Sequence, residues 1–142
     1  MSVVSSTVAS LRFGGVDLDP DQITMELGRK PDTFHRAGEV NRLPGGRERT
    51  WRKGLWSIQA TKAEPGDLDS QIESLLSGMT EDLAVWQRLA SMFHGDVFCG
   101  LFLKERNEGL LISSTTLRKL GERGLHLDLD IYDNDEEILQ QT

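Results

Sequence analysis

The clearest indication of the fold is the segment Leu125-His126-Leu127-Asp128-Leu129-Asp130-Ile131-Tyr132. Apolar and polar side chains alternate along it, and this period of two is typical of a β-strand with one buried face. We expect the odd positions to face a core and the even positions to face water or a partner. The stretch therefore predicts a sheet that is covered on one side only.

The residues before this strand predict the rest of a strand-helix-strand unit. Leu110-Leu111-Ile112 is a short apolar run, and Ser113-Ser114 open a helix that carries Leu117 and Leu120 on one face. The link to the final strand has roughly the dozen residues that a crossover between parallel strands needs. We interpret residues 109–132 as a β-α-β unit.

The remaining strands are predicted by similar patterns. Alternation predicts strands at 7–13 and 54–61. The apolar run at 97–103 predicts a central strand, either covered on both faces or using its second face for binding. The turn Asn107-Glu108-Gly109 predicts a hairpin between that strand and 110–112.

Three earlier helices are predicted by apolar residues three and four positions apart and by capping side chains. The first begins after Asp19, with a proline in its first turn, and ends at Gly28. The second begins at Asp67 or Asp69, and the third follows a break near Gly78.

The predicted order β-α-β-α-α-β-β-α-β favours an α+β fold. Because every helix needs the same apolar sheet face, we expect a two-layer, ferredoxin-like sandwich, a mixed sheet of about five strands with three or four helices on one face. Residues 1–132 then form a single domain with a long basic loop at 29–53, and 133–142 form an acidic C-terminal tail.

The composition argues against several classes of protein. The chain has 142 residues, 37% hydrophobic and 27% charged, as in an ordinary globular domain. It has no apolar stretch of membrane-spanning length and no secretory signal, and its single cysteine, Cys99, forms no internal disulfide, so we expect a cytoplasmic location. The net charge of −7 argues against nucleic acid and anionic membranes as partners.

The charge is unevenly distributed along the chain. Residues 29–53 contain eight of the sixteen lysines and arginines against three acidic residues, a net +5 that leaves −12 for the remainder. No apolar period runs through this segment, and loops longer than about a dozen residues are usually functional or disordered. The alternative is a solvated loop whose cations balance the acidic body.

This basic loop is the main candidate for a binding site. Clustered arginine side chains can bind a carboxylate, a phosphate or an acidic protein surface. The predicted ligand-binding or partner-binding residues are Arg36, Arg42, Arg47, Arg49, Arg52, Trp51 and Trp56. The tryptophans have a second interpretation, as anchors of the core.

Other reactive side chains have simpler explanations. His126, Asp128 and Asp130 share one side of the final strand and could form an acid/base pair or a set of metal ligands, but alternation alone requires polar residues there. Cys99 lies in an apolar run, where a thiol is usually an inert hydrophobe. We therefore predict no catalytic residue, no metal and no cofactor.

Several short motifs follow one another in order along the chain. They are Leu18-Asp19-Pro20, Ile23-Thr24, Leu27-Gly28 with Pro31, Gly38-Glu39, Trp56-Ser57-Ile58, and Leu120 followed by 125–132. In order and spacing the chain resembles the bacterial domain-of-unknown-function family numbered 4279, over roughly Val8 to Tyr132. The resemblance implies a small α+β domain and brings no established activity, cofactor or catalytic residue.

Two hypotheses for the function follow. The preferred one is a non-enzymatic binding module whose partner is another protein. Its specific form is an immunity-type protein that neutralises a toxin by protein-protein contact, because complementary charge speeds and selects association. The alternative is a small-molecule sensor or enzyme that holds an anionic ligand through the basic loop. A concave pocket where arginines converge with Trp51 or Trp56 favours the alternative, and a flat loop favours the first. Both hypotheses leave the oligomeric state open.

Overall fold

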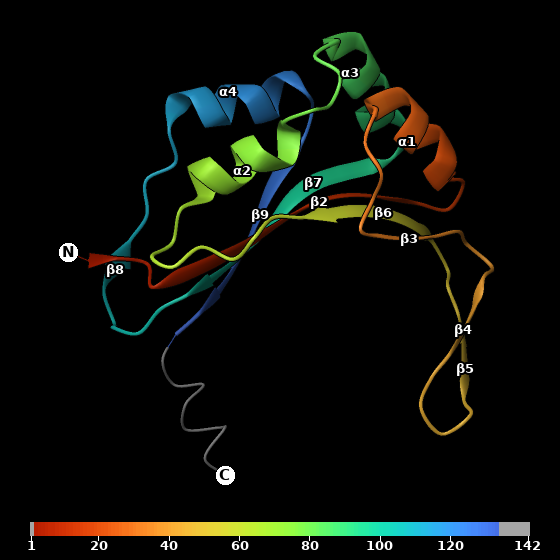
Figure 1. The fold of residues 1–142 in the computed structure, drawn as a ribbon, viewed down its shortest axis with the longest axis horizontal. Coiled ribbons are helices and arrows are strands. Elements are labelled where there is room, and N and C mark those ends of the chain that lie inside the picture. Colours follow the sequence, from red (N-terminus) through yellow and green to blue (C-terminus); the bar gives the residue numbers. More distant parts are fainter. Residues whose placement is uncertain (1, 134–142) are drawn as a thin grey trace.

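The computed structural model of the chain describes residues 2–133, so the predicted acidic tail after Asp133 lies outside the described residues. The elements follow one another along the chain (Figure 1) in the order β1 (Ser2–Val3), β2 (Ser6–Gly15), α1 (Pro20–Leu27), β3 (Thr33–His35), β4 (Val40–Arg42), β5 (Glu48–Thr50), β6 (Gly54–Gln59), α2 (Leu68–Leu76), α3 (Leu83–Met92), β7 (His94–Phe102), β8 (Glu108–Gly109), α4 (Ser114–Glu122) and β9 (His126–Tyr132).

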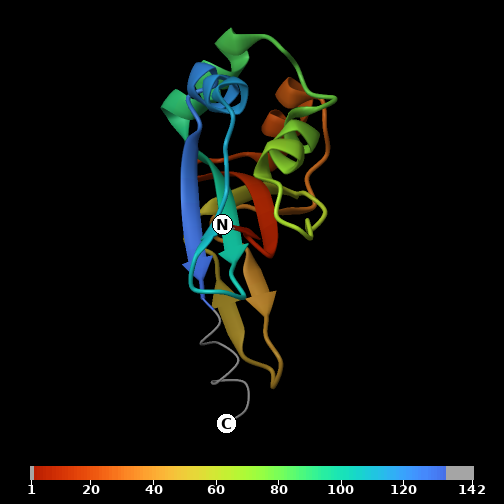
Figure 2. The ribbon, with the colours of Figure 1, turned by 90° about the vertical axis from the view of Figure 1, so that its left-hand side faces the viewer.

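Five of these strands form a mixed sheet in the order β3-β6-β2-β7-β9. Strand β2 runs antiparallel to both β6 and β7, whereas β9 runs parallel to β7. The four helices lie on one side of the sheet (Figures 1 and 2). The predicted α+β class and the mixed five-stranded sheet are confirmed. Within residues 2–133, no helix has the length and apolar character needed to cross a bilayer.

The predicted β-α-β unit exists, but its first strand was assigned wrongly. It consists of β7, α4 and β9, and residues 110–112 do not form a strand. The predicted hairpin with 97–103 is also wrong, because β2 and β9 occupy both edges of β7. Leu110 and Ile112 lie in the segment that connects β8 to α4 and pack against the core, which explains their apolar character.

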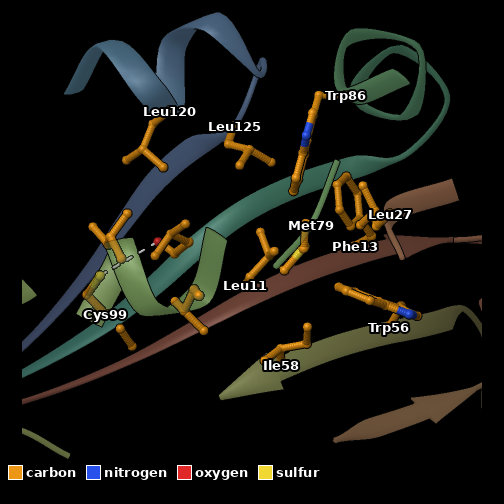
Figure 3. Close-up of a cluster of buried hydrophobic side chains, with 14 of the residues drawn as sticks. Leu11, Phe13, Leu27, Trp56, Ile58, Met79, Trp86, Cys99, Leu120 and Leu125 are labelled. Carbon is orange, nitrogen blue, oxygen red and sulfur yellow. Dashed lines mark hydrogen bonds between the residues drawn. The ribbon is translucent and has the colours of Figure 1, made fainter. Parts of the chain in front are cut away.

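The core fills the space between the helices and the covered face of the sheet (Figure 3). Leu11 and Phe13 from β2 and Ile58 from β6 face helical side chains such as Leu27 and Leu120. Burying an aliphatic or aromatic side chain of this size contributes about 1.5–3 kcal/mol to folding, so this layer supplies most of the stability.

The helix ends follow the capping residues in the sequence. Asp19 caps α1 and Gly28 ends it in the left-handed conformation, as predicted. Asp67, not Asp69, caps α2. Asp69 accepts a hydrogen bond from the backbone N–H of Ser113 at 3.0 Å, which joins the starts of α2 and α4.

The prediction for α4 needs one correction. Ser113 caps this helix and Leu120 is buried, as expected. Leu117 is half exposed to solvent, and Thr116 takes the buried position instead. Residues four apart lie on the same face of a helix, so Thr116 and Leu120 define the packed side.

The final strand is only partly covered. Leu125 is buried and Leu127 packs against the core, but Leu129 and Ile131 are 43% and 60% exposed. The expectation that every odd position faces a core is therefore wrong for the second half of the strand. The reason is that β9 is the edge of the sheet and α4 lies above its beginning (Figure 1).

The segment 29–53 was predicted to be one long loop, and the structure shows three short strands in it. Strand β3 adds to the edge of the sheet beside β6, while β4 and β5 pair with each other in an antiparallel ribbon. We call residues 36–53 the basic arm. It projects from the sheet on the side opposite the helices (Figures 1 and 2).

The strands of the basic arm were not predicted, because each is three residues long and exposed. Without burial there is no period of two in hydrophobicity, which is the signal that predicts a strand. Gly45 and Gly46, both with positive φ, form the turn at the end of the ribbon.

Candidate functional site

The side of the five-stranded sheet that the helices leave uncovered is the surface where a site can lie, and we call it the open face. The strand register places on it the even-numbered residues of β2 and β7, the odd-numbered residues of β6 and the even-numbered residues of β9. The predicted outward face of the final strand is thereby confirmed. Its larger members are Arg12, Leu55, His94, Asp96, Phe98, Phe102, His126, Asp128, Asp130 and Tyr132.

A groove lies where the basic arm joins the open face, and we call it the arm groove. Its volume is about 730 Å³, and its lining residues are Gly14, His35, Arg49, Thr50, Trp51, Arg52, Lys53, Gly54 and Leu55. Three of these residues are cationic and none is acidic. The concave site that the sequence analysis set as a criterion for a small ligand is therefore present.

The missing side chain at Gly14 makes room for the groove. Gly14 pairs with Leu55 on one side and with His94 on the other, so the row across the open face has a gap at its centre. A Cβ atom at Gly14 would meet only a backbone oxygen at 3.8 Å. A larger residue there would fit the strand and fill the floor of the groove.

Two aromatic rings and a guanidinium stack along one wall of the groove. The rings of His35 and Trp51 are 3.9 Å apart and inclined by 11°. The guanidinium carbon of Arg49 lies 4.4 Å from the centre of the Trp51 ring, a cation–π contact. These contacts restrict the Arg49 side chain.

His35 is uncharged at neutral pH. Burial lowers the pKa of its imidazole, and this effect outweighs the opposite influence of Glu39. Its Nδ1 atom is buried and has no hydrogen-bond partner. His35 therefore acts at neutral pH as a flat stacking surface for Trp51 and adds no charge to the groove.

The cations of the groove form no ion pair in the part of the chain that the structure describes. Among residues 2–133, no carboxylate lies within the 4.0 Å of an ion pair from Arg49, Arg52 or Lys53. Like charges placed together repel one another, and an anion between them relieves that repulsion. The arrangement is suited to holding a carboxylate or a phosphate.

The structure separates the predicted binding residues into groups. Arg49, Trp51 and Arg52 line the groove. Arg42 and Arg47 lie farther out on the ribbon, where Arg42 has a loose contact of 3.9 Å with Glu48.

Two of the predicted binding residues have structural roles instead. Arg36 is bound to Asp19 and Asp21 at 2.6 and 3.1 Å and ties the basic arm to the start of α1. Trp56 is fully buried and donates a hydrogen bond from Nε1 to Thr24, so it cannot contact a ligand. Its assignment as a binding residue is therefore wrong.

A second polar cluster, which no pattern in the sequence indicated, lies at the centre of the open face. Arg12 donates two hydrogen bonds, of 2.9 and 2.7 Å, to the carboxylate of Asp96, whose side chain is 2% exposed. Arg12 also lies over the ring of Phe98, 4.5 Å from its centre. The hydrogen bond with Asp96 raises the pKa of Arg12, so the guanidinium stays charged.

Two histidines border this cluster. The rings of His94 and His126 stack with centres 5.2 Å apart, and Nε2 of His94 lies 3.5 Å from Asp96. No group of three potential metal ligands forms anywhere in the described part of the chain. Because Arg12 and Asp96 neutralise each other, the cluster is a structural ion pair and offers no unpaired charge to a ligand.

Cys99 faces the covered side of the sheet. It is fully buried, and burial raises the pKa of its thiol to about 12. The thiolate is the nucleophilic form, so Cys99 is unreactive in the folded chain, as its place in an apolar run predicted.

The comparison with known families supports the resemblance found in the sequence. The family described as Domain of unknown function (DUF4279) matches residues 5–134. No curated protein and no solved structure shows a detectable match to the chain. Because the matched segment includes every strand of the central sheet and all four helices, the chain belongs to the family Domain of unknown function (DUF4279).

Proposed function

We propose that the protein is a binding module that holds an anionic group, a carboxylate or a phosphate, in the arm groove. The observation that supports this proposal is that Arg49, Arg52 and Lys53 line the same groove and that none of its lining residues is acidic. Of the two functional hypotheses, a concave site beside Trp51 favours the one with an anionic ligand. Binding, without catalysis, is the function proposed.

The chemistry of the three cations suits such a ligand. Arg49 presents a planar fork that matches two oxygens of a carboxylate or phosphate, and its stacking on Trp51 holds the fork in place before the ligand arrives. Less conformational freedom is then lost on binding, which strengthens affinity. Leu55 offers an apolar surface beside the charged wall.

The proposal is tested by calorimetry and thermal unfolding with inorganic phosphate and with citrate at low ionic strength. A ligand at 100 times its dissociation constant stabilises the folded state by about 2.7 kcal/mol. The variant R49A/R52A removes two of the cations, and Gly14→Val fills the floor. If phosphate or citrate stabilises the wild type, R49A/R52A and Gly14→Val are each expected to abolish binding of that anion.

The matched control is Lys30→Ala, which removes an exposed cation that does not line the groove. It is expected to bind as the wild type does. If neither anion binds the wild type, or if R49A/R52A and Gly14→Val bind as tightly as the wild type, the arm groove is not an anion site.

The immunity-type role is a second candidate function. It is supported by the position of β9 as the last strand of the five-stranded sheet, where Leu129 and Ile131 are exposed and a strand of a partner protein could add to the sheet. Co-expression with a toxin encoded beside this gene tests it. Restored growth supports the role, and continued growth arrest with the folded protein present contradicts it.

A further inference from the structure

The open face carries opposite charges at its two ends. The basic arm joins the sheet at the edge formed by β3 and β6, and it has six cationic and two acidic residues. Strand β9 forms the other edge, and its Asp128 and Asp130 share the open face. No lysine or arginine occurs between His126 and Tyr132. The same surface therefore has a positive end and a negative end.

We propose that this face binds a second copy of the chain, with the basic arm of each copy against β9 of the other. In a dimer with a two-fold axis, both copies use the same surface for the interface. That surface must therefore be complementary to itself. Opposite charges at the two ends of one face satisfy that condition. Each dimer then contains two equivalent contacts between an arm and β9.

The dimensions of the basic arm agree with this arrangement. Packed sheets lie about 10 Å apart. Residues 39–45 run outward along the ribbon and span about 20 Å in an extended conformation. The arm projects on the open side of the sheet (Figures 1 and 2). Its length is greater than the spacing of two packed sheets, so in the proposed dimer it is long enough to extend alongside the edge of the second sheet.

Side chains of opposite charge are present at the two surfaces that this contact would bring together, the outer part of the arm and β9. Arg42 and Arg47 lie in the outer part of the arm and are exposed. At the receiving edge, Asp128 is 3.7 Å from Arg12, but both hydrogen bonds of that guanidinium go to Asp96. The charge of Asp128 is therefore only partly compensated within one copy.

Apolar contacts lie between the two charged ends. Phe102 and Tyr132 stack with their ring centres 4.9 Å apart and an angle of 6°, and Phe98 lies under Arg12. These rings and Val8 are half-buried on the open face. A second copy would remove them from water, which adds a favourable term of about 25 cal/mol per Å² of apolar area.

The charge pattern also selects this face over the edge of the sheet. Two copies of β9 paired antiparallel about Leu129 would place Asp128 opposite Asp130 twice. Like charges at directly opposed positions destabilise a pair of strands. Contact through the open face avoids this repulsion and places the aspartates of one copy against the arginines of the other.

A charge swap tests the proposal in the full chain. Sedimentation and light scattering at low ionic strength are expected to give twice the 15.9 kDa mass of the chain. The variants R42E/R47E and D128K/D130K are each expected to halve that mass. Mixing the two variants restores the dimer, because each arm then meets a β9 of opposite charge.

The control variant K30E/R118E changes the net charge as much as R42E/R47E does, at two exposed positions away from the open face. It is expected to stay dimeric. Circular dichroism checks the fold of each variant. If R42E/R47E does not fold, the milder variant R42A/R47A is measured in its place and is expected to weaken the dimer.

Three results would overturn the proposal: a monomeric wild type, a dimer that survives both reversals, or reversed variants that do not pair on mixing. The proposal does not depend on anion binding. Arg42 and Arg47 do not line the arm groove, whereas Arg49 and Arg52 do. Failure of either proposal is therefore recognised separately.

Discussion

Replacing Arg12 by Met tests the ion pair at the centre of the open face. Methionine keeps an unbranched stem over Phe98 and removes the guanidinium. The carboxylate of Asp96 then stays 2% exposed without its partner. Removing one member of a fully buried pair costs about 3–5 kcal/mol.

The expected loss for Arg12→Met is smaller than that range. The side chain of Arg12 is 37% exposed, so water takes over part of its role once it is removed. We expect a loss of about 2–3 kcal/mol in the free energy of unfolding. For a domain of this size that corresponds to roughly 10 °C in melting temperature and about 1 M in the urea midpoint.

A double-mutant cycle separates the charge effect from packing. Asp96→Ala leaves a guanidinium that water can reach, so it is expected to cost less than Arg12→Met. The double variant R12M/D96A leaves no unpaired charge and is expected to recover most of the loss. Urea unfolding measures the free energy of unfolding of all four proteins, and the dependence of that free energy on urea concentration is expected to be the same in each. A loss below about 0.5 kcal/mol for Arg12→Met, or a double variant no more stable than it, refutes the reasoning.

Three further predictions follow from single residues. Gly95→Ala places a Cβ atom 2.7 Å from the ring of Phe13 in the core, and urea unfolding is expected to show a loss of about 1–3 kcal/mol, whereas a neutral effect contradicts the packing. Cys99 is expected to resist a thiol reagent in the folded chain and to react after unfolding, because burial raises its pKa to about 12. Burial lowers the pKa of His35, so the unfolded chain binds its proton more readily, and stability is expected to fall as the pH drops below about 6.5. His35→Asn should flatten that pH dependence, and an unchanged slope would contradict it.

The regular elements of the chain were largely predictable. Asp19, Gly28 and Ser113 mark helix ends through local hydrogen bonds and backbone preferences, which do not depend on the rest of the fold. The alternation in 125–132 likewise predicted which side of β9 is polar. Such signals involve residues a few positions apart, so a sequence shows them directly.

The arm groove was predictable only in part. The excess of arginine in 29–53 pointed to the basic arm, and three of the proposed residues, Arg49, Trp51 and Arg52, do line the groove. His35 and Gly14 were missed, because one lies in a short strand without periodicity and the other is a gap opposite a residue far along the chain.

The α+β class, the polar side of the last strand and the location of the positive charge all follow from the order of residues along the chain. Tertiary structure alone decided that Arg12 meets Asp96, that Trp56 enters the core and that β9 ends uncovered at an edge. The physical reason is distance along the chain. Caps and periodicity arise between neighbours, whereas strand order and register join residues many positions apart, and only the assembled sheet brings their side chains into contact.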